Sequence, residues 1–175
     1  MKLTFISMFM LMLCLNLSAQ TQKGRLLIGG TFGSSQIDLD RGDWTLLITP
    51  KAQYFLANRL SVGGGLVASY WSYWSGPNYL RLGLSPEFRY YFYELPNVKF
   101  FCNALGGYSH LFESGSYVSS DFFNLGMGLG TNIMFNNRIA LELGLQYNHD
   151  FSSGAYYSRN TLNFEIGVVG FLGKD

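Results

Sequence analysis

The residues that could do chemistry in this sequence are few, and its two histidines come first. Each has an acid and a serine close behind it: His149 with Asp150 and Ser152, and His110 with Glu113 and Ser114. A histidine held by an acid can activate a serine as a nucleophile. These sets are the hypotheses for catalysis, with His149 and Ser152 as candidate catalytic residues. No metal site and no cofactor are predicted.

A second set of candidate residues is charged and falls within stretches of alternating polarity. It has four members of each sign: Lys51, Arg81, Glu87, Arg89, Lys99, Glu142, Asp150 and Glu165. Such a set could line a selective pore or supply an acid and base pair. Enclosed charges are costly unless they are paired, so a balanced set favours mutual pairing. We therefore expect a polar plug, with amide side chains such as Asn132 completing the network.

The stretches that carry these charges have the pattern of β-strands. Residues 80–94 read LRLGLSPEFRYYFYE, in which bulky apolar or aromatic residues alternate with small, polar or charged ones. A period of two indicates a strand with two unlike faces. The run of about thirteen residues is long beside the usual five or six of a soluble strand.

Short turn signals divide the chain into hairpins. They lie at residues 56–59, 94–97 and 136–138, each between two alternating runs and about forty residues from the next. Longer polar or aromatic segments lie between them, at residues 34–42, 72–78, 112–120 and 151–160. Four hairpins and eight strands follow, with short turns at one end and longer loops at the other. The turn at Asn137 predicts that Asn132 lies across from Glu142.

Three features indicate that the apolar face meets lipid. The polar face consists mostly of Gly, Ser, Thr and Asn with few charges, unlike a surface exposed to water. Small side chains suit the narrow interior of an eight-stranded barrel. Runs of this length also match the roughly 9 to 11 residues that a tilted strand needs to cross a bilayer. The predicted fold is all-β, a transmembrane eight-stranded antiparallel up-and-down β-barrel with Arg81, Glu87 and Arg89 in its lumen.

The N-terminal segment predicts export. Residues 1–19 contain Lys2, an apolar run and the pair Ser18-Ala19, the pattern of a cleaved signal peptide. Residues 20–175 are then the barrel domain, with 11 basic and 11 acidic residues once Lys2 is removed. This balance gives no reason to expect nucleic acid as a partner. Only Cys102 remains after cleavage, so no intramolecular disulfide is expected.

These features resemble a known family. The signal peptide, the four hairpins and the phrase ITPKAQYFLANRLSVGGGLVASY are similar to the small eight-stranded outer-membrane barrels of the OmpA, OmpX and OmpW type, nearest to those of Bacteroidetes. The resemblance covers residues 20–175. It implies a Gram-negative outer membrane, contact with outer-membrane lipid and lipopolysaccharide, and insertion by the barrel-insertion machinery.

The resemblance leaves three functions open. The first is a structural or surface-interaction role, in which Trp74, Tyr156 and Tyr157 form a loop surface for an extracellular ligand. The second is a conduit for small hydrophobic molecules, which predicts an apolar lumen pocket around Leu47, Val67, Phe101 and Leu105. The third is a lipid A-modifying enzyme.

The spacing around the histidines argues against the enzyme. The resemblance implies that a catalytic histidine and serine share a strand face two residues apart, whereas here Phe151 and Phe112 hold those positions. We therefore expect both histidines in an interfacial aromatic girdle, and Trp71 and Tyr73 likewise. Pro50 and Pro86 cannot donate to a ladder within a strand, which predicts a bulge at each.

Overall fold

The computed structural model describes residues 21–33, 37–38, 43–72, 78–113, 119–152 and 159–173, and the predicted leader at 1–19 lies outside them. These residues form one antiparallel sheet of β1 (Leu26–Gly33), β2 (Ile37–Asp38), β3 (Asp43–Ala57), β4 (Leu60–Ser72), β5 (Tyr79–Glu94), β6 (Val98–Glu113), β7 (Ser119–Met134), β8 (Ile139–Ser152) and β9 (Arg159–Leu172). Among the described residues there is no helix with the length and apolar character that crossing a membrane requires.

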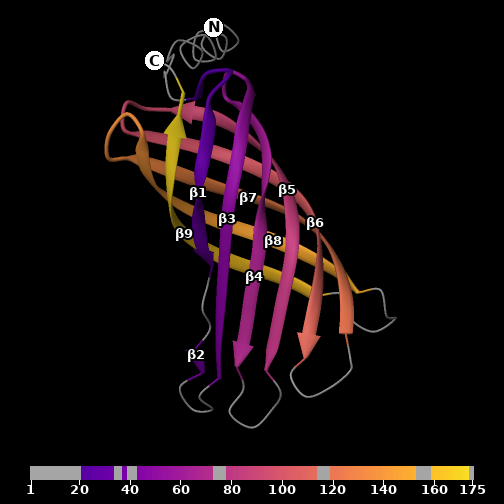
Figure 1. Ribbon diagram of the computed structural model, residues 1–175. Coiled ribbons are helices and arrows are strands. Elements are labelled where there is room, and N and C mark those ends of the chain that lie inside the picture. Colours follow the sequence, from indigo (N-terminus) through magenta and orange to yellow (C-terminus); the bar gives the residue numbers. More distant parts are fainter. Residues whose placement is uncertain are drawn as a thin grey trace, which may run out of the picture.

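The sheet closes into a barrel. Consecutive strands pair from β3 to β9, and β1 pairs with both β9 and β3 (Figure 1). β2 adds only two residue pairs beside β3. The wall therefore has eight strands, which confirms the predicted fold class.

The two ends of the barrel differ in their connections. Short links join β3 to β4, β5 to β6, and β7 to β8, all at one end of the barrel. Leu26 at the start of β1 pairs with Leu172 at the end of β9, and this pair lies at the same end. We call this the turn end. The remaining strands are joined by longer segments at the opposite end, the loop end (Figure 1).

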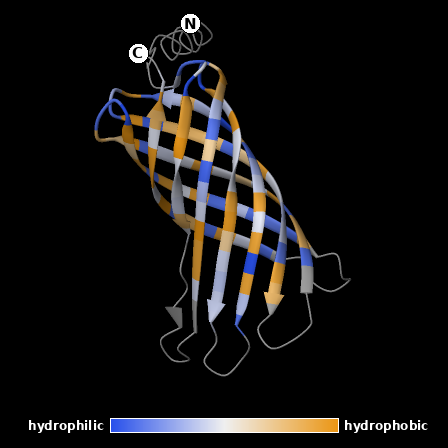
Figure 2. Ribbon diagram, in the orientation of Figure 1, coloured by the Kyte–Doolittle hydropathy of each residue, from blue (hydrophilic) through white to orange (hydrophobic). Residues whose placement is uncertain are grey.

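Apolar and polar residues alternate along the strands, as the colours of Figure 2 show, and their exposure places the apolar side chains outside and the polar ones in the lumen. Leu84, Met127 and Phe164 are 62%, 66% and 69% exposed on the outside. Arg89, Glu142 and Asn132 are almost fully buried on the inside. A broad exposed apolar belt suits contact with hydrocarbon rather than water.

Apolar side chains form a layer across the lumen near the turn end. Phe55, Tyr91 and Phe171 are buried there, with ring centroids 5.8 Å apart for Phe55 and Tyr91 and 6.3 Å apart for Phe55 and Phe171. Phe101 joins them with its centroid 5.7 Å from that of Tyr91. This aromatic layer closes the interior between the strands at the turn end.

The prediction of a bulge at each proline was wrong. The β3–β4 ladder pairs Ile48 with Ala68 and then Lys51 with Gly65, so pairing lapses at Pro50 without a change of register. The β5–β6 ladder lapses in the same way at Pro86. A missing N–H interrupts the pairing, while the partner strand on the other side still holds each proline in place. The register shifts instead lie near the short turns, between Phe55 and Ala57 and between Tyr91 and Tyr93.

Candidate functional site

Glu142 on β8 is the centre of a buried ionic network. Arg89 Nη1 donates to Glu142 Oε2 at 2.7 Å, and Arg89 Nη2 donates to Oε1 at 3.0 Å. Lys51 Nζ donates to Oε1, and Asn132 Nδ2 donates to Oε2 at 2.9 Å. Asn132 and Glu142 are also directly paired across β7 and β8, which confirms the predicted register. Two cations and an amide thus satisfy one carboxylate.

Arg89 extends this network across the lumen. Its Nε and Nη2 atoms donate to Glu87 Oε1 at 3.1 and 3.0 Å. Asn103 Nδ2 donates to the same oxygen at 2.9 Å and to Gln146 Oε1 at 3.0 Å. The guanidinium also lies 3.9 Å from the ring centroid of Phe101, a cation–π distance. The network therefore rests directly on the aromatic layer.

Arg81 and Asp150 form a second link nearer the loop end. Arg81 Nη1 and Nη2 donate to Asp150 Oδ2 and Oδ1, each at 2.9 Å, and Arg81 Nε donates to Ser109 Oγ at 2.6 Å. Such paired bonds between a guanidinium and a carboxylate are among the strongest hydrogen-bonding arrangements in proteins.

The two arginine links join the same pair of strands, β5 and β8, although these strands are not neighbours in the sheet. We call Arg89–Glu142 the turn-end brace and Arg81–Asp150 the loop-end brace. Arg81 and Arg89 are eight positions apart in the sequence, and so are Glu142 and Asp150. The braces are thus in register across the lumen, and together they hold opposite sides of the barrel wall.

Lys99 lies apart from this network. It is buried at the turn end and is paired across β5 and β6 with Glu94. Glu94 also accepts a hydrogen bond from Thr21 Oγ1 and lies 3.6 Å from Arg59 Nε. The charged lumen residues named from the sequence thus fall into a central network, a loop-end brace, this turn-end group and Glu165, which lines a pocket.

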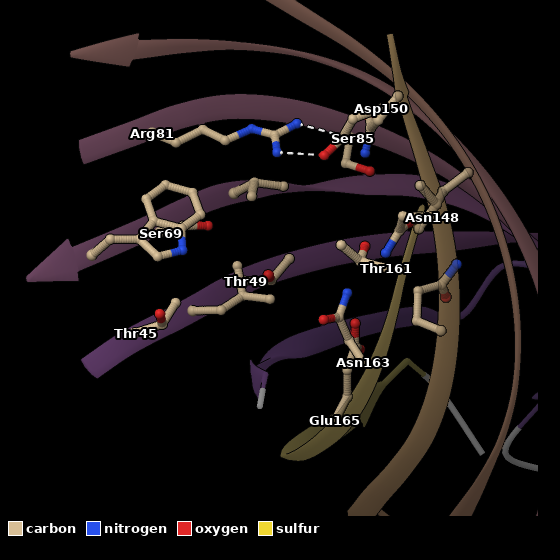
Figure 3. Close-up of a pocket in the computed structure, with 16 residues that line it drawn as sticks. Thr45, Thr49, Ser69, Arg81, Ser85, Asn148, Asp150, Thr161, Asn163 and Glu165 are labelled. Carbon is tan, nitrogen blue, oxygen red and sulfur yellow. Dashed lines mark hydrogen bonds and ion pairs between the residues drawn. The ribbon is translucent and has the colours of Figure 1, made fainter. Parts of the chain in front are cut away.

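A pocket lies in the lumen on the loop-end side of the central network. Figure 3 shows the side chains that line it. Leu47, Val67 and Leu105 line it, whereas Phe101 is in the aromatic layer below. Polar groups from β8 and β9, including Asn148, Asp150 and Asn163, line its other side. Trp71 lines the pocket as well, which corrects its assignment to the outer girdle.

Both histidines lie on the outer surface, in two matching clusters. His110 Nδ1 is 2.7 Å from Asp121 Oδ1, which also accepts a bond from Tyr108 Oη at 2.6 Å. In the second cluster His149 Nδ1 is 2.6 Å from Asn160 Oδ1, which accepts from Tyr147 Oη at 2.9 Å.

A repeated pattern in the sequence carried the signal for these clusters. It is Tyr-x-His-x-Phe, at residues 108–112 and 147–151, with Asp121 or Asn160 eleven positions after the histidine. The rings of Phe112 and Phe151 stand edge-on to their histidines, with centroids 4.5 and 4.3 Å apart. Asp121 and Asn160 were not among the predicted site residues, because the two segments were not recognised as a repeat.

This geometry separates the proposed catalytic residues. Asp150 faces the lumen and binds Arg81, so it does not orient the outward-facing His149. The side chains of Ser152, Glu113 and Ser114 lie outside those described, as do the predicted loop residues Trp74, Tyr156, Tyr157 and Tyr73. In the part of the chain that is described, no cluster of three His, Cys, Asp or Glu residues could hold a metal.

Comparison with known proteins supports the fold. No protein-family model and no curated protein matches the sequence. Neisserial surface protein A is 16% identical over 83% of this chain and 95% of its own, with a TM-score of 0.60. Outer membrane protein OprG from Pseudomonas aeruginosa is 16% identical over 89% and 99%, with a TM-score of 0.56. The N-terminal β-barrel domain of OprF from the same organism is 14% identical over 86% and 98%, with a TM-score of 0.55. The chain thus has the fold of the small outer-membrane β-barrels.

Proposed function

We propose that this protein is a sealed outer-membrane barrel that acts as a scaffold and exerts its function at the membrane and through its loops. The observation that carries the proposal is the filled lumen. The turn-end brace, Lys51, Glu87 and Asn132 span the interior directly above the aromatic layer. Eight strands enclose a space that side chains can fill completely.

The charges inside support a structural rather than a conducting role. Each ionic group of the central network has a partner of opposite sign, and Glu142 and Arg89 are 1% exposed. An ion would have to break bonds that are strong because the groups are buried. A selective pore instead needs binding that is weak enough for release.

The outer surface supports contact with outer-membrane lipid and lipopolysaccharide, reached through the barrel-insertion machinery. The exposed apolar belt covers the strands, and the two Tyr-His clusters lie toward the loop end. Aromatic side chains with a polar tip favour the boundary between hydrocarbon and water. The longer connections at this end carry Trp74, Tyr156 and Tyr157, which we propose as the surface that contacts an extracellular ligand.

Liposome swelling tests whether the barrel is sealed. Vesicles containing the refolded protein should not swell in small sugars, whereas an Arg89→Ala/Glu142→Ala variant, which removes the turn-end brace, should admit them faster. Heat-dependent gel mobility would show that both proteins are folded. Swelling with the unaltered barrel at the rate of a known porin would overturn the proposal.

A further inference from the structure

Among the described residues in the middle and at the loop end of the lumen, the charges balance except at one residue. In the central network Lys51 and Arg89 match Glu87 and Glu142, and at the loop end Arg81 matches Asp150. Glu165 on β9 is left over. Among the described residues, no basic group lies within 4.0 Å of its carboxylate, and Lys51, which attracts it electrostatically, bonds to Glu142 instead.

Glu165 faces the loop-end pocket and has one neutral donor. Thr31 Oγ1 donates to Glu165 Oε2 at 3.2 Å. Figure 3 shows Glu165 and the loop-end brace at opposite sides of the pocket, with Asn163 beside Glu165 on the same strand. An enclosed carboxylate is stabilised by an opposite charge, and among the described residues none forms an ion pair with Glu165.

The rest of the pocket offers surfaces of two kinds. Leu47, Val67 and Leu105 provide an apolar wall from β3, β4 and β6. The opposite strands, β8 and β9, provide polar side chains, among them those of Asn148 and Asn163. The volume is about 180 Å³. An apolar cavity of about 150 Å³ holds a benzene molecule, so one small ring fits.

We propose that this pocket binds a small organic cation that carries an apolar group. The ammonium group pairs with Glu165, and the apolar group packs against Leu47, Val67 and Leu105. The site is separate from the network that seals the lumen, so ligand binding and ion conduction can be tested independently.

Trp71 lines the pocket and reports on its occupant. The full chain is expressed with its own leader, purified in a neutral detergent, and carries Trp44→Phe and Trp74→Phe so that Trp71 is the sole tryptophan. Benzylammonium is titrated against Trp71 fluorescence, with benzyl alcohol as a probe of similar shape and no charge. Benzylammonium should bind at least about tenfold more tightly than benzyl alcohol, because a charged hydrogen bond is made only by the cation.

Three variants decide the result. Glu165→Gln should abolish the preference for benzylammonium and leave benzyl alcohol binding unchanged, while Glu165→Asp should retain part of the preference. Asp121→Asn is the matched control, since it removes one negative charge outside the lumen and copies the natural Asn160 cluster. Equal affinity for the two probes, or loss of the preference in Asp121→Asn but not in Glu165→Gln, would overturn the proposal.

Discussion

Glu142→Gln should be the most damaging conservative substitution in the lumen. Glutamine keeps the size of the side chain and one acceptor oxygen, but it removes the negative charge that four donor contacts share. Its own N–H groups would also face Arg89, Lys51 and Asn132, which are donors. Two buried cations would then have Glu87 as the remaining acid of the network.

The structure sets the size of this effect. Removing one partner from a buried ion pair costs about 3–5 kcal/mol, because the opposite charge is left unpaired. Asp150→Asn should cost less, since the side chains of the loop-end brace are 10% and 14% exposed and water can reach them. Glu165→Gln should not destabilise the barrel, because this carboxylate lacks an ion-pair partner among the described residues. The expected order of stability loss is therefore Glu142, then Asp150, then Glu165.

Denaturant unfolding in lipid vesicles measures the order, with gel mobility of unheated samples counting the folded fraction. An Arg89→Met/Glu142→Leu double variant is the matched control, because it removes one charge of each sign. Lys51 and Glu87 then remain as one positive and one negative charge, so the net charge of the network stays zero. It should be more stable than Glu142→Gln. Unfolding of Glu142→Gln within about 1 kcal/mol of the unaltered protein would refute the buried-pair reasoning, as would an equal loss in Glu165→Gln.

Two further pairs of substitutions test the two faces of the wall. Gly128→Ala should reduce the free energy of unfolding by about 1–3 kcal/mol, because the added Cβ would lie 2.9 Å from the Leu145 carbonyl oxygen and press on Gln146. Gly144→Ala should be tolerated, because the nearest atom to its added Cβ would be 3.6 Å away. Denaturant unfolding compares the two variants. Met127→Arg, near the middle of β7, should cost about 2–4 kcal/mol in a bilayer, while Phe135→Arg at the turn end should cost about 0–1. Equal costs for the two arginines in lipid vesicles would contradict a lipid-facing belt.

The sequence was sufficient for the fold because two physical signals agreed. Period-two alternation identifies two faces, and residues 80–92 show it along most of β5. The small residues of the polar face then indicate which side is enclosed. Gly128 illustrates this, since Asn103 and Gln146 fill the space that its missing side chain leaves. Strand number followed from the spacing of the short turns.

Contacts across the lumen could not be read in the same way. Alternation places Arg81, Arg89, Asp150 and Glu142 on the inner face, but it does not show that β5 and β8 face each other. That relation depends on the stagger and closure of the whole barrel. The equal spacing of eight residues between the arginines and between the acids is a signal that could be sought in other sequences.

The predictions for Trp71, Pro50 and Pro86 were wrong because a general rule was preferred to the alternation within the strand. Trp71 shares its face with Ser69 and Val67 and therefore points inward, although aromatic residues near a loop commonly form a girdle. Bulges were expected at Pro50 and Pro86, but losing one donor from a ladder does not require an extra residue. Lys99 has the inward parity that was predicted, but its place near the turn gives it different neighbours.

Planar-bilayer conductance of the folded barrel tests the sealed lumen most directly. The unaltered protein should insert and remain silent at moderate voltage, because the turn-end brace and the aromatic layer leave no path for ions. The Arg89→Ala/Glu142→Ala variant, inserted under the same conditions, should show discrete openings. Steady channels from the unaltered barrel, with a conductance altered by Glu87→Gln or Arg89→Gln, would contradict the account and identify the central network as the lining of a pore.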